Sequence, residues 1–353
     1  MFASARARAS PETPGTSSSR RGCGCARART RRRGATRASR ADADEGNDVF
    51  RAIAIERAVE PLVTRTSTLN EGIAKFYDES SELWERVWGS DGGDGTHMHH
   101  GYYRAGEPID HAKAQVDMIE ESLKFAGVEG ARRVLDVGCG IGGSSRHMVR
   151  KWDGCAAEGV TLSPVQAARA NALAIEQGVE DRANYRVADA LNTPFEDASF
   201  DFVWSMESGE HMPDKKKFVD ELARVCEPGG TILIVTWCHR VLKDGETELE
   251  AGEKILLDRI CDAYYLPAWC SVADYESLAK DAGLVDIRTA DWSEEVKPFW
   301  KGVIKTALTP RGIIGLIKSG AATLRGALVM PLMQTGLATG TIKFNVIVAR
   351  KPI

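Results

Sequence analysis

The chain has 353 residues, a formal net charge of −4 at pH 7 and 27% charged residues. Its first 41 residues hold eleven arginines, one acid and no lysine, which is a charge of +10, so the remaining residues have a net charge of −14. Such an acidic domain is not built to neutralise nucleic-acid phosphates. Eight cysteines without a CxxC pair exclude a disulfide framework, and the longest uncharged run, 326–342, is too broken by Pro331 and glycines for a clean transmembrane span.

The amino-terminal segment, residues 1–45, differs in composition from everything after it. It is rich in arginine and serine, poor in acids and has no long apolar core, which is typical of a mitochondrial or chloroplast transit peptide. The alternative is a basic tail that binds nucleic acid. We favour targeting because the bias stops abruptly and nothing later is basic. A linker follows over 46–66, and one large domain over 67–353.

Short apolar strands that alternate with amphipathic helices predict an α/β domain with a parallel sheet covered on both faces. The expected helices before the sheet span 69–89 and 110–128. The expected strands span 132–137, 155–162, 183–188, 200–206 and 231–237, with helices over 163–177 and 214–226 among the segments between them. Residues 246–340 are expected to be mostly helical with one strand over 283–292, and a last strand spans 342–352.

A glycine-rich turn, "VLDVGCGIGG", lies between the first strand and its helix, where the backbone can closely approach a nucleotide-like ligand. Gly138-x-Gly140-x-x-Gly143 satisfies the dinucleotide fingerprint, but that fingerprint wants an acid at the end of the second strand. Thr161 stands there, and Glu158 falls in mid-strand. Asp136, two residues before the first glycine, instead gives the pattern of S-adenosylmethionine (SAM) methyltransferases.

Several longer motifs carry a more specific signal than this turn. "GVTLSPVQAARAN", "SMESGEHMPDKKKFV", "HMHHGYY", "YYLPAWCS" and "ADWSEEVKPFW" together resemble the gamma-tocopherol methyltransferases of plants and algae, from about Leu69 to the last residue. The resemblance implies a Rossmann-like, seven-stranded class I SAM-dependent methyltransferase with an antiparallel last strand, a helical insertion over 240–340 and amino-terminal lid helices. It also implies methylation of a chromanol ring carbon of gamma- and delta-tocopherol in plastids. One departure is "SDGGDGT", an apparent insertion at 90–96 beside the lid.

The cofactor SAM is expected at the carboxyl rim of the sheet. Asp136 would lie near its amino group, and the glycines allow close approach of the main chain. By comparison with related enzymes, Asp189 would accept a hydrogen bond from the adenine, although it could instead be a turn residue. The full set of expected cofactor contacts is Asp136, Gly138, Gly140, Thr161, Leu162, Gln166, Asp189, Ala190, Met206 and, by resemblance, Tyr103 of the lid.

Carbon methylation needs an electron-rich acceptor, and removal of the phenolic proton supplies it. Glu207 and His211 are titratable members of "SMESGEH", and we expect one of these two to be the general base, with His211 favoured by its near-neutral reference pKa. The alternative for His211 is a purely structural role. "HMHH" has no acidic or cysteine partner at suggestive spacing, so no metal site is expected.

The acceptor side is less defined by sequence. Five aromatic residues could enclose the chromanol ring, or could be ordinary core: Tyr265, Trp269, Trp292, Phe299 and Trp300. Residues 309–333 pair sparse cations with apolar positions, which suits peripheral association with the envelope or plastoglobules, a dimer interface or plain core. Within the class, the alternative acceptors are another prenylated phenol or quinol, or an indole nitrogen. A nicotinamide oxidoreductase and a lipid-binding protein are the alternatives outside it.

Overall fold

The structure, a computed structural model, describes residues 97–307 and 321–353, with side chains described outside 301–328. The predicted transit peptide, the linker, the helix expected over 69–89 and the insertion at 90–96 lie outside the described residues.

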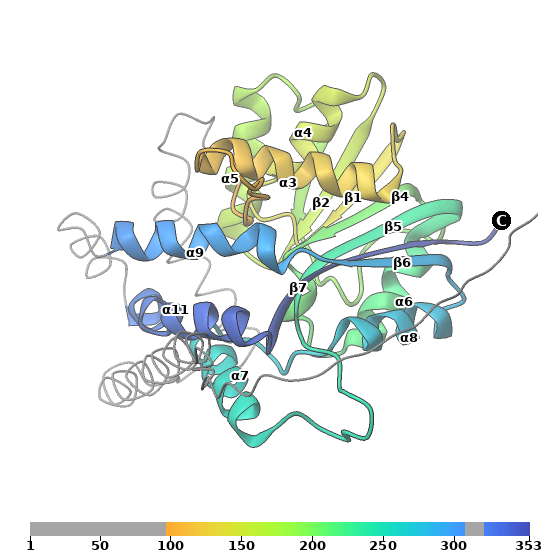
Figure 1. The fold of residues 1–353 in the computed structure, drawn as a ribbon. Helices are drawn as coiled ribbons and strands as arrows, with labels where there is room; N and C mark the ends of the chain where they lie inside the picture. The colour runs from red at the N-terminus through yellow and green to blue at the C-terminus, as the bar shows by residue number, and fades with distance from the viewer. Residues whose placement is uncertain (1–96, 308–320) are drawn as a thin grey trace, which may run out of the picture. The chain divides into compact units, whose positions relative to one another are not determined.

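A seven-stranded mixed sheet forms the centre of the described domain (Figure 1). Its strands lie in the order β3-β2-β1-β4-β5-β7-β6, and β7 runs antiparallel to both its neighbours, β5 and β6. The strands are β1 (Arg133–Val137), β2 (Ala156–Thr161), β3 (Ala183–Val187), β4 (Phe200–Met206), β5 (Cys226–His239), β6 (Val285–Asp291) and β7 (Ile342–Arg350). Every predicted strand is present, and the expected seven-stranded methyltransferase sheet is confirmed.

Helices cover the sheet on both faces. The described helices are α3 (His111–Ala126), α4 (Gly143–Lys151), α5 (Pro164–Glu176), the short η2 (Gly209–His211), α6 (Lys215–Val225), α7 (Ala251–Ala263), α8 (Val272–Asp281), α9 (Ser293–Ala307) and α11 (Ala321–Thr339). Polar side chains cap the amino-terminal ends of several helices. The Asp110 side chain accepts a hydrogen bond from the amide of the third residue of α3, and the Ser163 side chain does the same for α5. Ser271 and Asp274 form a capping box at the start of α8.

Alternation along the strands separates the core into two layers. Successive side chains point to opposite faces of a sheet. On β1, Val134 packs in the layer with α3, α4 and α5, and its neighbour Leu135 packs in the layer with α6 and α8. On β4, Trp204 and Val203 divide in the same way. Both faces are thus apolar, as the nearly continuous apolar strands predicted.

The late helices form two groups. Helix α8 packs against α6, β6 and β7 as part of the sheet's cover, whereas α11 packs against α7, α9 and β7 (Figure 1). Residues of α11 that fell in the expected membrane-binding segment, namely Val329, Met330, Leu332 and Met333, are buried in the first layer of the core. Within the described part of the chain, none of the helices combines the length and hydrophobicity needed to cross a bilayer.

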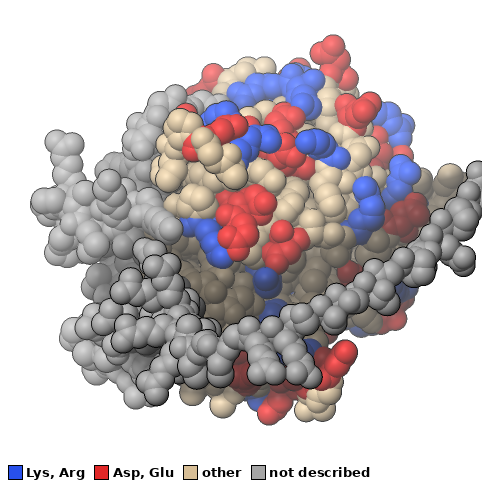
Figure 2. Space-filling model, in the orientation of Figure 1, with Lys and Arg blue, Asp and Glu red and all other residues tan. Residues whose placement is uncertain are grey.

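Acidic and basic side chains are interspersed on the face drawn in Figure 2. Among the described ion pairs, Lys113 pairs with Asp117 along α3 at 2.5 Å, and Arg104, before this helix, pairs with Glu121 on it at 2.7 Å. This face therefore presents no field of a single sign.

Candidate active site

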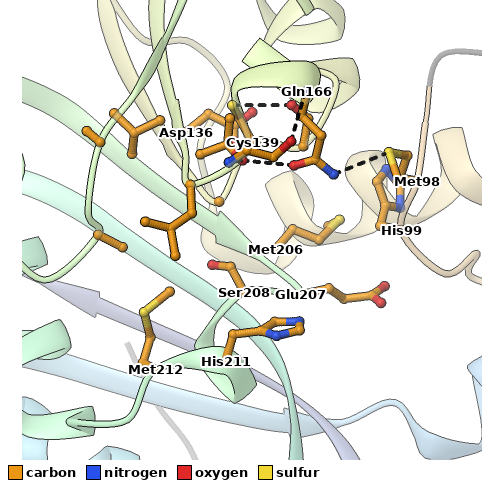
Figure 3. A pocket seen from close by; sticks show the side chains of 18 of the residues that line it. Met98, His99, Asp136, Cys139, Gln166, Met206, Glu207, Ser208, His211 and Met212 are labelled. Carbon is orange, nitrogen blue, oxygen red and sulfur yellow. Dashed lines mark hydrogen bonds between the residues drawn. The ribbon is translucent and has the colours of Figure 1, made fainter. Parts of the chain in front are cut away.

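A cavity lies at the carboxyl ends of β1 to β4, beside the glycine-rich turn (Figure 3). Carboxyl ends of parallel strands meet on one edge of a sheet, so residues far apart in sequence converge there. Eleven of the residues expected from the sequence line this cavity: Asp136, Gly138, Gly140, Thr161, Leu162, Gln166, Asp189, Ala190, Met206, Glu207 and His211.

The glycine-rich turn has left-handed backbone conformations where the sequence predicted them. Gly138, Gly140 and Gly142 have φ values of 78°, 52° and 76°. A Cβ at Gly138 would lie 2.2 Å from the Cβ of Ser208, whereas at Gly140 the nearest atom would be the Sδ of Met98, at 3.9 Å. Gly138 is therefore required by packing against the turn after β4, and Gly140 leaves room for a ligand.

Asp136 is a buried carboxylate at the wall of this cavity. Its Oδ2 accepts a hydrogen bond from the Ser145 hydroxyl at 2.8 Å. Burial raises the pKa of Asp136 to about 6, even though Ser145 and Arg146 act to lower it. A ligand ammonium group would offset this burial, so the site fits the amino group of SAM.

The ends of β2 and β3 supply the next contacts. The Thr161 hydroxyl donates to Oε1 of Gln166 at 2.8 Å, and Nε2 of Gln166 lies 3.9 Å from the Sδ of Met98. Oδ1 of Asp189 accepts from the amide of Leu191 at 2.9 Å, which is a turn interaction that leaves its other oxygen for a ligand.

Glu158, the acid that the dinucleotide alternative would need, pairs with Arg186 at 2.6 Å in the middle of β2. It is not among the residues that line the cavity. The alternative of a nicotinamide cofactor therefore lacks the acidic residue that would bind the ribose.

Residues 97–103, "HMHHGYY", lie across the cavity and are called the lid here. Met98 and His99 line the cavity. The side chain of Gln115 on α3 holds the lid by donating to the carbonyls of His97 at 3.3 Å and His99 at 2.9 Å. The backbone of Tyr102 also donates to the carbonyl of Ala114 at 2.8 Å.

Tyr103 is the one expected cofactor contact that does not line the cavity. Its hydroxyl bonds Nδ1 of His111 at 2.6 Å, and burial raises its pKa well above the usual value. The side chain faces a separate groove between α3 and α9. Tyr103 thus lies in the lid but outside this cavity, and its contact with the cofactor stays a prediction.

Glu207 is held in an unusual way at the end of β4. Its backbone is in the left-handed region, with φ 51°. Its Oε1 accepts the backbone N–H of His100 at 2.5 Å, and its Oε2 lies 2.5 Å from Nδ1 of the same residue. Burial alone would raise the pKa of Glu207, but His100 and His99 lower it below the ordinary value. Glu207 is therefore an anion that binds the lid. No local sequence pattern could indicate this pair, because 107 positions separate its members.

His211 and Glu210 follow Glu207 on η2. Burial, assisted by the charge of Lys215, lowers the pKa of His211 to about 3, so its imidazole is neutral and weakly basic. Burial and the neighbouring Glu207 raise the pKa of Glu210 to about 8, and its Oε2 accepts from the Thr236 hydroxyl at 2.7 Å. The geometry thus favours Glu207 over His211 as the charged group of the motif.

An aromatic cluster surrounds the ring of His100. The centroid of its ring lies 4.2 Å from that of Phe299, 5.2 Å from Trp300 and 5.1 Å from Trp237, and Trp237 stacks on Trp269. Three of the five aromatics expected at the acceptor side, Trp269, Phe299 and Trp300, belong to this cluster. Trp292 packs elsewhere, on Tyr102 and Phe125. In the described ranges, no group of three metal-ligating side chains gathers, the lid histidines included.

The fold and this site together define a class I SAM-dependent methyltransferase. A family model described as a methyltransferase domain matches residues 135–234. A solved structure of geranyl diphosphate methyltransferase shares the fold, with a TM-score of 0.65 and 23% identity over 81% of this chain and 100% of that one.

Two plant proteins are much more similar. The probable chloroplastic tocopherol O-methyltransferase of Oryza sativa subsp. japonica is 58% identical over 80% of this chain and 79% of its own length. The chloroplastic tocopherol O-methyltransferase of Arabidopsis thaliana is 53% identical over 84% and 86%. The chain belongs to this family of tocopherol methyltransferases, uses SAM, and is a plastid protein.

Proposed function

We propose that the chain transfers the methyl group of SAM to a ring carbon of gamma-tocopherol, giving alpha-tocopherol, and converts delta- to beta-tocopherol in the same way. The relatives named tocopherol O-methyltransferases support the substrate class. The observation that carries the proposal is the aromatic cluster around His100, whose side chain bonds Glu207 at the wall of the cofactor cavity. Such rings suit a flat aromatic alcohol.

SAM supplies an electrophilic methyl group on a sulfonium. In this proposal the Asp136 carboxylate binds the amino group, the main chain at Gly138 and Gly140 approaches the ligand closely, and Asp189 and Ala190 bind the adenine. Thr161, Leu162, Gln166 and Met206 complete the wall.

The acceptor is activated by losing its phenolic proton, whose pKa is near 10 in a free phenol. We propose that the "SMESGEH" turn provides the general base for this step or the charge that supports it, through the Glu207 carboxylate, with the neutral imidazole of His211 as the alternative base. The lid excludes water, so a methyl group is passed to the acceptor instead of being lost by hydrolysis.

The test is to incubate the protein, without residues 1–45, with SAM and separate acceptors: gamma- and delta-tocopherol, tocotrienols, a prenylated hydroquinone and an indole alkaloid. The methylated atom of each product is then identified by NMR. A new methyl on a ring carbon of the tocopherols is expected. Methyl on the phenolic oxygen, or transfer only to the indole nitrogen, would overturn the proposal.

We also propose that the enzyme works at the surface of the plastid envelope or of plastoglobules, where a phytylated substrate resides. Residues 329–333 of this segment are partly core, and residues 309–320 lie outside the described residues. Flotation with galactolipid vesicles should carry the wild type upward, and Lys318→Glu with Arg325→Glu should reduce this. Equal flotation of both would contradict the assignment.

A further inference from the structure

We propose that His100, on the lid, is the group that takes the proton from the acceptor's ring hydroxyl, and that Glu207 orients it. This inference rests on the proposed function, because it requires a phenolic acceptor. It assigns a chemical role to the lid, which the sequence indicated only as a cover.

The hydrogen bonds fix which nitrogen of His100 is basic. An ionised carboxylate only accepts hydrogen bonds, so the 2.5 Å contact between Oε2 of Glu207 and Nδ1 requires the proton to lie on Nδ1. Nε2 then carries the lone pair. This arrangement of carboxylate, imidazole and substrate hydroxyl is the general one for a histidine base, with the carboxylate stabilising the imidazolium that forms.

Nε2 of His100 is buried and, among the residues that the structure describes, has no hydrogen-bond partner. The indole N–H of Trp300, in the same cluster, is likewise buried without a partner in the described ranges. Two buried polar atoms without partners, on rings of one cluster, are costly unless a ligand satisfies them. A phenolic hydroxyl both donates and accepts, and its ring suits the aromatic cluster.

The position of His100 also connects this base to the cofactor. Met98 and His99, the two residues before it, line the cofactor cavity, while His100 reaches Glu207 with both its backbone and its ring. The other titratable groups facing the pair are His99 on the lid and Glu210 and His211 after β4. The base is therefore assembled only when the lid lies over the cavity.

In the proposed step, Nε2 of His100 takes the hydroxyl proton. The electron pair of the broken O–H bond then raises the electron density at the ortho carbon of the ring. That carbon forms the new C–C bond as the S–CH₃ bond of the donor breaks, leaving S-adenosylhomocysteine and a dienone. The dienone loses the proton of the methylated carbon to water, and its oxygen regains the proton held by His100.

The decisive variant is His100→Gln in the protein without residues 1–45, with gamma-tocopherol as acceptor. We expect kcat at pH 7.5 to fall by about 10²- to 10⁴-fold, the range for loss of a general base. Because hydroxide must then remove the proton, the residual rate should rise by about tenfold per pH unit up to the phenol's own pKa. Affinity for S-adenosylhomocysteine, measured by calorimetry, should stay within threefold of wild type.

The matched control is His147→Gln. His147 also bonds a carboxylate, Glu120 at 2.7 Å, but lies on α4 outside the cavity, so its kcat should be unchanged. A His100→Gln enzyme with wild-type kcat would overturn the inference. So would a loss that alkaline pH does not rescue and that runs parallel to weaker S-adenosylhomocysteine binding, because His100 would then only pack the lid. If the wild type methylates none of the phenols, the proposed function fails first, and this inference with it.

Discussion

Two buried carboxylates at the site have pKa values shifted in opposite directions. Burial raises the pKa of both groups; it dominates at Asp136, whose pKa is about 6, whereas at Glu207 the charge and hydrogen bonds of His100 outweigh it and lower the pKa. The difference follows from the partners: the hydroxyl and amide of Ser145 in one case, and an imidazole as well as an amide in the other. The two residues should therefore respond differently to pH and to substitution.

Asp136 should make SAM binding sensitive to acid. Since its pKa without ligand is about 6, the carboxylate that binds the ammonium group is progressively protonated below that pH. We expect the Kd for SAM, measured by calorimetry, to rise by up to about tenfold per pH unit below pH 6.

Asp136→Asn should bind SAM weakly and with no dependence on pH between 5 and 7. Asp201→Asn, which removes a carboxylate outside the cavity, should keep the wild-type dependence. A wild-type affinity that is constant from pH 7 to pH 5 would refute the role of Asp136.

Glu207→Gln should abolish most turnover while leaving cofactor binding intact. The amide keeps the shape of the side chain but carries no charge to hold the Nδ1 proton of His100 or to stabilise an imidazolium. We expect kcat to fall by at least about 10²-fold and the Kd for SAM to change by less than threefold. The control Glu221→Gln, which removes a carboxylate bonded to Thr193 away from the cavity, should keep its kcat. Equal losses in both would mean that the effect is structural.

Among the elements, the turn between β1 and α4 is the most constrained. Gly142 caps α4 with φ 76°, and a Cβ there would lie 2.4 Å from the ring of Tyr185. Gly178 has a similar φ, 65°, but a Cβ there would meet nothing within 4 Å. A comparison of alanine substitutions at Gly142 and Gly178 therefore separates the cost of backbone strain, which both share, from the cost of a steric clash, which only Gly142 has.

Gly178→Ala should lower the free energy of unfolding by about 1 kcal/mol, the cost of a left-handed alanine. Gly142→Ala adds overpacking, so we expect a loss about 1–3 kcal/mol larger, and a correspondingly larger fall in Tm by differential scanning fluorimetry. Equal Tm values for the two variants would show that Tyr185 moves aside freely.

Sequence patterns predicted the elements well because central strands such as β4 are apolar on both faces and several helices have local caps, such as Asp110 and Ser163. Most residues that line the cavity were also predictable, since they follow strand ends in a regular order. The pairing of His100 with Glu207 and the position of Tyr103 outside the cavity were not, because both depend on how the lid lies on α3 and α9. Contacts across such distances leave no periodic signal in the chain.

At the scale of the whole molecule, buried titratable groups set the pH of greatest stability. Burial lowers the pKa of His97, His99 and His211 below 6.5, so at acid pH the unfolded chain binds three protons that the folded chain does not. Burial raises the pKa of Asp136 to about 6 and of Glu210 to about 8, so the folded chain holds two protons that the unfolded chain lacks.

Below pH 6 the unfolded state therefore binds more protons than the folded state, because the three histidines with lowered pKa outnumber the two carboxyls with raised pKa, and stability should fall as the pH decreases. Toward pH 8 the histidines are deprotonated in both states and the raised pKa of Glu210 dominates, so stability should fall as the pH rises. Tm measured from pH 4.5 to 8 should thus peak near pH 6–6.5, and His97→Gln should flatten the acid side. A wild-type Tm that increases toward pH 5 would contradict this account.

The placement of β7 in the sheet has a consequence for how the protein is made. β7 follows β6 in the chain yet separates it from β5, so β6 emerges from the ribosome long before the strand it must pair with. Until then the growing chain exposes two open strand edges, on β5 and on β6, which can recruit a neighbouring nascent chain. Completion of the sheet must await the last-made strand, and a ribosome that stalls before Ile342 releases an aggregation-prone fragment rather than a smaller enzyme.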